Sequence, residues 1–400
     1  MPSCLDRDPK VCLVSQFDAP PRGVSPYSTE LRDSLHNELG ARLASYDYEA
    51  PFPGGLHPSG SSSIRGSNSE PGLHWARPKS WIPLIESSAN VVHFQHWLAP
   101  MAFYLLAVTR RLKQRGCKIV ITVHNPIPHE SLGLLSAPEM RWFALADAVI
   151  VHDARGRDAL LERGVVAARI HEIPHGVALS GTLDAYSPTS GGPGRKGEKT
   201  SRRYVVMFGN LRGYKGVGVL LKAWREVCKS LDDVELVIAG RLWDGGSSPM
   251  ASLAARILGT RKDAHAIRLQ LADPLFVERV RLIEGFVSDE DLDELLDGAE
   301  LAVFPYVRFA SQSGAACRAV GRGCPVLVSD VGALPELAIG PDWIVPPEDV
   351  ERLTRALIDR LKWVGQSDCR AAQFQRVKSL EWQAVARTHA ALYRSLGPLV

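Results

Sequence analysis

Cysteine is scarce in this sequence, and the few cysteines follow no pairing pattern. Seven are scattered over 400 residues, an odd number with no C-x-x-C pair. Disulfide frameworks and structural zinc sites both depend on dense or closely spaced cysteines. The pattern therefore argues against both, and we expect reduced thiols that are mostly buried.

Long apolar runs and a strong charge of one sign are missing as well. The longest apolar stretch, around Met101–Thr109, is too short to cross a bilayer and is followed by charged residues. The first residues lack the basic start and the long apolar middle of a signal peptide. A net charge of +3 is too small to indicate a nucleic acid or another polyanion as partner. We therefore expect a cytoplasmic protein.

What the sequence does have is an alternation of short apolar strands with amphipathic helices, which is typical of parallel α/β sheets. Its apolar fraction of 45% and charged fraction of 23% are those of a globular protein, and its length allows two domains. In the first half, leucines at four-residue spacing predict a helix over Tyr27–Leu39. The predicted strands of this half are Val11–Gln16, Val91–Gln95, Lys118–Val123 and Ala148–His152.

The alternation stops in a low-complexity stretch and then restarts. Gly, Ser, Pro and Lys dominate Ser180–Arg203, so we predict a flexible linker there, and a mobile loop over the similar stretch Pro53–Pro71. The predicted strands of the second half are Tyr204–Phe208, Val234–Ala239, Val280–Glu284, Leu301–Pro305 and Val326–Ser329. Its predicted helices are Val217–Ser230, Glu290–Leu296 and Gly314–Gly321.

These elements predict two doubly wound, Rossmann-like domains that face each other across a cleft. We expect the first domain over residues 1–179, the linker over 180–203 and the second domain over 204–375. Ligands of such folds bind at the carboxyl ends of the strands, so both sheets should direct these ends at the cleft.

Four sequence blocks in the second half, in this order, resemble glycosyltransferase family 4, whose members are retaining enzymes of the GT-B fold. The blocks are FGNLRGYKGVGVLLKAW (208–224), ELVIAGRLWD (235–244), VRLIEGFVSDEDLDELLDGAELAVFPY (280–306) and ASQSGAACRAVGRGCPVLVSDVGALPEL (310–337). The first half matches more loosely through HFQHW, ITVHNPIPH and ALADAVIVHDARGRDALL. Residues 376–400 contain SLEWQAVARTHAALY, which resembles the family's last helix and implies a crossing back to the first domain.

The first block is suited to binding the diphosphate of a nucleotide sugar. It places Arg212 and Lys215 just beyond a strand, in a turn whose glycines, Gly209 among them, let backbone N–H groups approach a phosphate. Many family members have an arginine directly after the first glycine, where this chain has Asn210. Arg212 is expected to substitute for it, and Arg241 of the second block is expected to bind the donor as well. A solvated surface loop is the alternative.

Two further segments belong to the donor site that the resemblance implies. The run Ser311, Gln312, Ser313, Gly314 opens a helix, and its hydroxyls and N–H groups suit a distal phosphate or the sugar, although an ordinary N-cap has the same composition. Phe286 and Val287 follow a strand where the family reads the base through a loop, and Phe286 could equally belong to the core.

The chain departs from the family at its pair of glutamates, which stand eight positions apart. Alignment on the following Gly-x-Pro-Val places Ala310 and Arg318 at these positions. In the family the second glutamate accepts hydrogen bonds from the ribose, which an arginine cannot do. Three explanations remain open: the SQSG segment has taken over sugar contacts, Arg318 binds an acidic group of an unusual donor, or the protein is an inactive relative.

The first half contributes two candidate site positions. Gly23, in the loop after the first strand, resembles the family's glycine that borders the donor phosphate, and a simple strand–helix turn is the alternative. His124 ends a strand and resembles the histidine that contacts the donor sugar. His93 and His96 are three residues apart on a strand and must point to opposite faces, so a zinc pair is not expected.

The resemblance implies transfer of a hexose from a UDP- or GDP-linked donor, with retention, to a glycan, a lipid-linked or a small-molecule acceptor. His124, Arg212 and Lys215 would carry the catalysis, the two cations by stabilising the departing diphosphate. No cofactor is expected, and no metal, because no D-x-D motif stands where it would suit a metal-bound diphosphate.

A basic stretch raises the question of a membrane. Residues 107–118 concentrate five arginines and lysines after an apolar segment, so 101–118 could rest on an anionic bilayer at the inner face of a membrane. A helix buried on one side and solvated on the other explains the same pattern.

Overall fold

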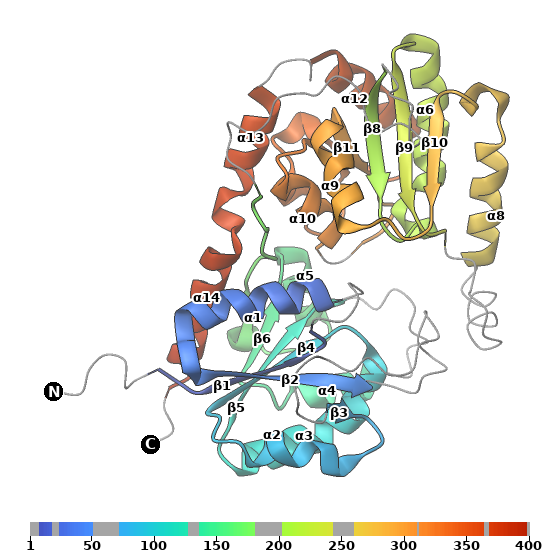
Figure 1. The fold of residues 1–400 in the computed structure, drawn as a ribbon. Coiled ribbons are helices and arrows are strands. Elements are labelled where there is room, and N and C mark those ends of the chain that lie inside the picture. Colours follow the sequence, from blue (N-terminus) through green and yellow to red (C-terminus); the bar gives the residue numbers. More distant parts are fainter. Residues whose placement is uncertain are drawn as a thin grey trace. The chain divides into compact units, whose positions relative to one another are not determined.

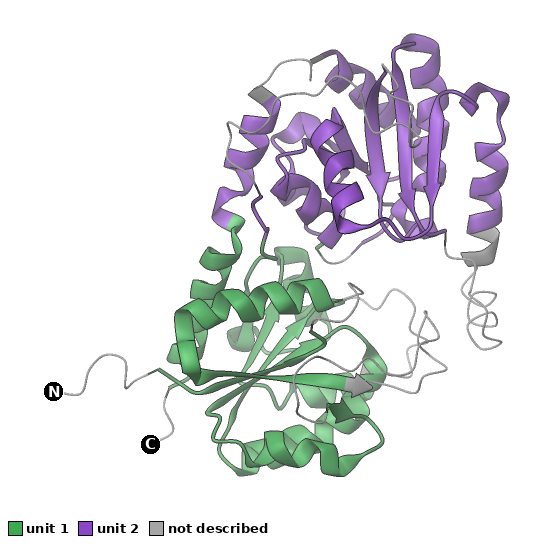
Figure 2. Cartoon of the chain, in the orientation of Figure 1, with its two compact units in different colours: residues 1–176, 310–312, 380–400 green, residues 177–309, 313–379 purple. Residues whose placement is uncertain are grey.

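The structure is a computed structural model that describes residues 8–17, 24–50, 72–126, 136–180, 202–242, 260–309, 312–363 and 368–397. The chain divides into two compact units (Figure 2). Unit 1 comprises residues 1–176, 310–312 and 380–400, and unit 2 comprises residues 177–309 and 313–379. The predicted loop Pro53–Pro71 and nearly all of the predicted linker Ser180–Arg203 lie outside the described residues.

Unit 1 contains a parallel sheet of seven strands in the order β3-β2-β1-β4-β5-β6-β7. The strands are β1 (Val11–Ser15), β2 (Leu43–Ala50), β3 (Leu73–His74), β4 (Val91–His96), β5 (Lys118–Val123), β6 (Ala148–Val151) and β7 (Ile170–Glu172). The four strands predicted from continuous apolar runs are confirmed and are adjacent at the centre, where both faces of the sheet are covered. β2, β3 and β7 lie nearer the edges and were not predicted.

The helices of unit 1 are α1 (Ser25–Leu39), α2 (Ile82–Glu86), α3 (Ala102–Gln114), α4 (Ser136–Phe143), α5 (Ala154–Glu162) and α14 (Trp382–Ser395). The last helix, from the end of the chain, packs on the first (Figure 1). Asn37 Nδ2 donates to Gln383 Oε1 at 3.2 Å, and Gln383 Nε2 donates to Glu38 Oε1 at 2.6 Å. A Cβ atom added to Gly176 would lie 2.1 Å from the Trp382 ring, so this glycine allows α14 to dock.

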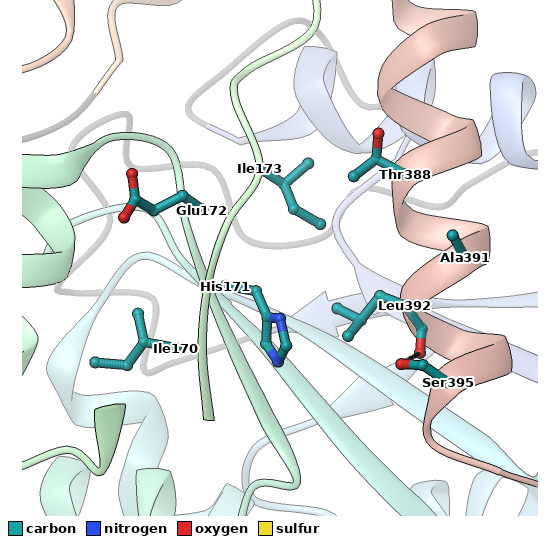
Figure 3. A pocket seen from close by; sticks show the side chains of 8 residues that line it. All are labelled: Ile170, His171, Glu172, Ile173, Thr388, Ala391, Leu392 and Ser395. Atoms are coloured by element: carbon teal, nitrogen blue, oxygen red, sulfur yellow. Dashed lines mark hydrogen bonds between the residues drawn. The ribbon is translucent and has the colours of Figure 1, made fainter. Parts of the chain in front are cut away.

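An open groove of about 450 Å³ runs between β7 and α14 (Figure 3). Its lining residues are Ile170, His171, Glu172, Ile173, Thr388, Ala391, Leu392 and Ser395. None of the site residues expected from the sequence lines this groove.

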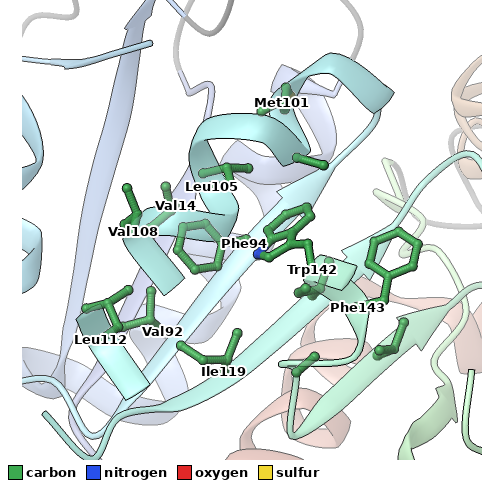
Figure 4. Packing of buried hydrophobic residues seen from close by; sticks show 14 of the residues in the cluster. Val14, Val92, Phe94, Met101, Leu105, Val108, Leu112, Ile119, Trp142 and Phe143 are labelled. Carbon is green, nitrogen blue, oxygen red and sulfur yellow. The ribbon is translucent and has the colours of Figure 1, made fainter. Parts of the chain in front are cut away.

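The opposite face of the sheet carries a core of aromatic and aliphatic side chains (Figure 4). Phe94 of β4 meets Trp142 of α4 with ring centroids 5.8 Å apart, and the Trp142 indole N–H donates to Thr109 Oγ1 at 2.8 Å. The inward stripe of α3 joins this core through Ala102, Leu105, Val108 and Leu112. Because this stripe is buried, the opposite side of α3 is exposed to solvent.

Unit 2 contains a parallel sheet of six strands in the order β10-β9-β8-β11-β12-β13. The strands are β8 (Arg203–Phe208), β9 (Val234–Gly240), β10 (Val280–Glu284), β11 (Leu301–Phe304), β12 (Val326–Ser329) and β13 (Ile344–Val345). The helices are α6 (Val217–Ser230), α8 (Thr260–Leu271), α9 (Asp289–Gly298), α10 (Gly314–Gly321), α11 (Leu334–Leu337), α12 (Val350–Trp363) and α13 (Asp368–Val377).

Each sheet grows outward in both directions from its first strand, which is the doubly wound topology expected from the sequence. The order reverses between β1 and β4 in unit 1 and between β8 and β11 in unit 2, and ligands of such sheets bind at these switch points. All six cysteines in the described ranges are free and buried, as predicted. In the same ranges, no helix combines the length and the apolarity needed to span a bilayer.

Candidate donor-binding site

The switch point of unit 2 is shaped by glycines at the ends of β8 and β9. Gly209 follows β8 with φ of +111°, and Gly240 ends β9 with φ of +141°. The two backbones approach so closely that a Cβ atom on Gly240 would lie 1.9 Å from the Gly209 carbonyl oxygen. Only glycine fits these positions, and the result is a sharply turned loop with exposed backbone after β8.

Lys215 is the last residue of the short 3-10 helix Gly213–Lys215, and its side chain lies close to Gly209 in this loop. The next residue, Gly216, is left-handed with φ of +75°, and a Cβ atom there would lie 1.8 Å from the Pro305 carbonyl oxygen. The Lys215 side chain turns inward, so that the residue is 8% exposed and Nζ lies 5.3 Å from the centre of the Tyr306 ring.

The ammonium group of Lys215 has no acidic partner among the described residues, where it makes neither a hydrogen bond nor an ion pair. Burial lowers the pKa of Lys215, Tyr214 offsets part of this effect, and Arg212 lowers the pKa slightly further. A buried cation without a counter-ion is costly, and folded proteins normally pair it. An anion placed beside this ammonium would offset the cost of its burial.

Tyr306 connects Lys215 with the start of α10. Its hydroxyl lies 2.9 Å from Ser313 Oγ, and the same Ser313 oxygen accepts from the backbone N–H of Ala316 at 3.3 Å as the N-cap of the helix. A Cβ atom on Gly314, the first helical residue, would have no atom within 4 Å. The open N-terminal turn of α10 thus lies next to the lysine and adds N–H donors and the positive end of the helix dipole.

The other expected donor-site residues lie in the loops after β8 and β9 and just before α10. Asn210 and Arg241 are exposed, Arg212 is half-buried, and the Leu211 N–H donates to the Arg241 carbonyl at 2.9 Å, which joins the loops after β8 and β9. Gln312 is 7% exposed, and neither its amide nitrogen nor its amide oxygen has a partner among the described residues. Ala310 and Ser311 lie outside the described residues, as does Gly23 of unit 1.

The loop after β10 carries an aromatic side chain into solvent. Gly285 turns the chain with φ of +124°, and Phe286 is 80% exposed, so the reading of Phe286 as a core residue was wrong. Val287 is half-buried, and Ser288 then caps α9 by accepting from the Asp291 N–H at 3.1 Å. An exposed phenylalanine beside the carboxyl ends of the strands offers a face on which a base can stack.

Arg318, which stands at the family's second glutamate position, is held by acidic residues of α9. Its guanidinium donates to both Asp289 and Asp293, the latter at 2.7 Å, and to the Asp289 backbone carbonyl at 2.8 Å. The next turn repeats the arrangement with Arg322 and Asp297. The arginine therefore fixes the start of α9, directly after the Phe286 loop, to α10.

In unit 1, His124 has both ring nitrogens engaged with other side chains. Nδ1 lies 3.2 Å from His152 Nε2, and Nε2 lies 2.8 Å from Gln95 Oε1, to which it donates because an amide oxygen only accepts. His152 Nδ1 faces the Ile173 carbonyl at 3.0 Å and must donate to it, because a carbonyl only accepts.

The neutral form of His124 follows from its surroundings. Burial lowers its pKa far below the ordinary value, and neighbouring histidines, His152 first, lower it further. A neutral ring that donates through Nε2 to Gln95 Oε1 keeps its lone pair on Nδ1, on the side of His152. A substrate oxygen could accept from the Nε2–H only in place of Gln95.

His93 and His96 point to opposite faces of the sheet, as their spacing requires. His93 lies 2.7 Å from both the Tyr393 hydroxyl and Thr122 Oγ1, on the side of α14. His96 donates through Nε2 to Glu139 at 2.7 Å on the other side of the sheet, and Glu139 also forms an ion pair with Arg163. In the described part of the chain, no group of three or more histidine, cysteine or acidic residues could hold a metal ion.

Two functional features were not found from the sequence. Tyr306 follows β11 as the last residue of the third sequence block, and that position was the available signal for its role between Lys215 and Ser313. Asp289 and Asp293 could not be paired with Arg318, because a single sequence contains no information on contacts between neighbouring helices.

The fold and this site define a class: a two-unit α/β protein with a buried lysine at the switch point of a doubly wound sheet, the arrangement of glycosyltransferases of the GT-B type. Two family models match the chain, Glycosyltransferase Family 4 over residues 22–180 and Glycosyl transferases group 1 over residues 202–362. The chain therefore belongs to the family 4, group 1 type of glycosyltransferases. No curated protein matches it.

Solved structures confirm the fold over the whole chain. A sucrose-phosphate synthase from Thermosynechococcus elongatus is 20% identical with a TM-score of 0.64, covering 96% of this chain and 98% of that one. Anabaena HepE, in complex with UDP and glucose, is 13% identical with a TM-score of 0.66, covering 96% and 100%. Trehalose-6-phosphate synthase is 12% identical with a TM-score of 0.68, covering 98% and 100%.

Proposed function

We propose that this chain transfers a hexose from a UDP- or GDP-linked donor bound by unit 2. The observation that carries the proposal is Lys215, a buried ammonium without an acidic partner among the described residues, at the switch point of a doubly wound sheet. A diphosphate provides the missing negative charge. The complexes of HepE with UDP and glucose support the choice of donor class.

Each residue of the site has a distinct role in this proposal. Lys215 and Arg212 neutralise the diphosphate and stabilise the charge that grows on it as it departs, together with the N–H groups at the start of α10. Phe286 stacks on the base, and Gln312 contacts the sugar through its amide. Arg318 acts as a positioning residue, because it holds α9 and the adjoining Phe286 loop in place.

The acceptor side is proposed to use unit 1. The Nε2–H of the neutral His124 donates a hydrogen bond to a sugar hydroxyl oxygen, which displaces Gln95 Oε1. Transfer is proposed to proceed with retention of the anomeric configuration. No metal is needed, because two cationic side chains stabilise the charge that a divalent ion stabilises in metal-dependent transferases. Analysis of the product anomer by NMR tests retention. Measurement of activity in the presence of a chelator tests whether a metal is needed.

The acceptor is a glycan, a lipid-linked sugar or a small molecule, and residues 101–118 are proposed to contact a membrane at its inner face.

An inactive relative that binds a nucleotide sugar or a partner is the second candidate. It is favoured by one observation, the pairing of Arg318 with Asp289 and Asp293 where relatives have a glutamate.

A panel of UDP, GDP, ADP and dTDP sugars in a thermal-shift assay tests the proposal, followed by measurement of nucleotide release with candidate acceptors. We expect one nucleotide class to raise the melting temperature and its sugar to turn over. Stabilisation without turnover on any acceptor would support the inactive relative. No stabilisation by any nucleotide would overturn both.

A further inference from the structure

α3 leaves a stripe of exposed residues on the side opposite to its buried stripe. Phe103, Ala107, Arg110, Arg111 and Gln114 recur at the spacing of one helix face, and all are exposed. Phe103 is 58% exposed, although phenylalanine is rarely left in water. The helix therefore presents an aromatic side chain at its start and arginines one to two turns later.

The segment Trp75–Ile82 lies beside α3 and has the same character. Trp75 is 38% exposed and Ile82 is 41% exposed, and the residues between them include the exposed Arg77 and Lys79. The segment leads into α2, which packs on α3 (Figure 1). The ring centroids of Trp81 and Tyr104 lie 5.5 Å apart. Three of the eight exposed large apolar side chains of the described chain thus gather here.

The charge of this region is strongly one-sided. Residues 72–118 contain seven arginines and lysines and a single acidic residue, Glu86. Lys113 and Lys118 pair with Asp147, at 2.8 Å and 3.8 Å. Arg110, Arg111 and Arg115 have no acidic partner among the described residues. Exposed apolar side chains and arginines without acidic partners among the described residues therefore occur together on α3 and its neighbouring segment.

We propose that Trp75, Ile82 and Phe103 insert into the interface of an anionic lipid bilayer, with Arg110 and Arg111 on its headgroups. Tryptophan and phenylalanine favour the boundary between headgroups and acyl chains, and each basic residue adds attraction to anionic lipids. An acidic protein or an RNA would need the cations but would leave Ile82 and Phe103 without an apolar environment. This proposal specifies the membrane contact that is part of the proposed function. It rests on the proposed function only in assuming that the acceptor can be lipid-linked.

Sedimentation with vesicles of phosphatidylcholine, with and without about one third phosphatidylglycerol, tests the proposal on the full chain. We expect binding to the anionic vesicles, a loss of about tenfold for Arg110→Gln/Arg111→Gln and a similar loss for Trp75→Ser/Phe103→Ser. The apolar variant should lose binding at high salt as well as at low salt, because insertion is not screened. Arg110→Gln/Arg111→Gln should lose vesicle binding mainly at low salt.

Matched controls lie on unit 2. Arg352→Gln/Arg355→Gln removes two exposed arginines from α12, and Leu269→Ser removes an exposed apolar side chain from α8, and neither should change vesicle binding. Stabilisation by nucleotide should be unchanged in all four variants, so failure of this inference is separable from failure of the donor site. Equal binding to neutral and anionic vesicles, no vesicle binding, or tighter binding to a single-stranded RNA than to vesicles would overturn the proposal.

Discussion

Acidification should destabilise unit 1, because histidines from several of its elements are buried in neutral form around the sheet. Burial lowers the pKa of His152 and of His389 to about 4 and that of His175 to about 3. Their ordinary pKa is about 6.5. Since the unfolded chain binds protons that the folded chain excludes, the stability these groups contribute is present above pH of about 6.5 and is lost as the pH falls toward 4.

The size of the effect follows from the two pKa values. At a pH of about 5, each of the three residues costs about 2 kcal/mol relative to neutral pH, so together they cost about 6 kcal/mol. The buried His93 and the half-buried His124 have pKa values lowered in the same direction and add to the loss. A domain is stable by only about 5–15 kcal/mol, so unit 1 should be close to unfolding at that pH.

Urea denaturation at pH of about 7.5 and about 5, with hydrogen exchange of the β4, β5 and α14 peptides, measures this loss. His389 is the best single test, because its Nε2 is buried without a partner among the described residues and leucine is accommodated at little cost. His389→Leu should reduce the acid-induced loss by about 2 kcal/mol. Replacement of the exposed His36 by Gln serves as control. If the total loss were under about 2 kcal/mol, or equal in His389→Leu and the parent, the assignment of neutral buried histidines would be wrong.

Three further predictions concern single positions. Gly176→Ala places a methyl group 2.1 Å from the Trp382 ring, so it should cost about 1–3 kcal/mol of stability and raise hydrogen exchange in α14. Unchanged exchange in α14 would contradict the role of Gly176 in docking this helix. Phe286→Ala should weaken UDP binding at least about fivefold but leave pyrophosphate binding unchanged in calorimetry, whereas the equally exposed Val277→Ala should change neither. Arg318→Gln should release the start of α9, visible as faster exchange in Asp289–Gly298, and weaken UDP binding less than any change at Lys215 does. An unaltered α9 would refute its positioning role.

The fold was largely predictable because its central strands are continuous apolar runs and its helices are amphipathic. The bounds of α6, α10, β10 and β12 were predicted to the residue, since each ends at a polar or glycine residue. β2 was missed because residues such as Ser45 and Asp47 interrupt its apolar pattern, and β7 because it is only three residues long. Strands near a sheet edge need less apolar surface and leave a weaker pattern.

The candidate site was predictable only where local sequence determines it. Gly209, Lys215 and the N-cap Ser313 were found because turns and caps have local rules. The burial of Lys215 over Tyr306, the pairing of Arg318 with α9 and the hydrogen bonds between His124 and His152 depend on contacts between distant segments. Residue types alone could not decide whether Arg318 was free or held.

The central claim is that Lys215 is the buried counter-charge of a nucleotide diphosphate. Calorimetric titration with UDP and GDP, on the parent chain and on Lys215→Met, tests it most directly, because methionine keeps the length of the side chain and removes the charge. Lys222→Met, at an exposed lysine of α6, is the matched control. The account predicts tight binding of one nucleotide to the parent and to the control, and a loss of at least about hundredfold in Lys215→Met. Equal affinity in all three proteins would contradict it.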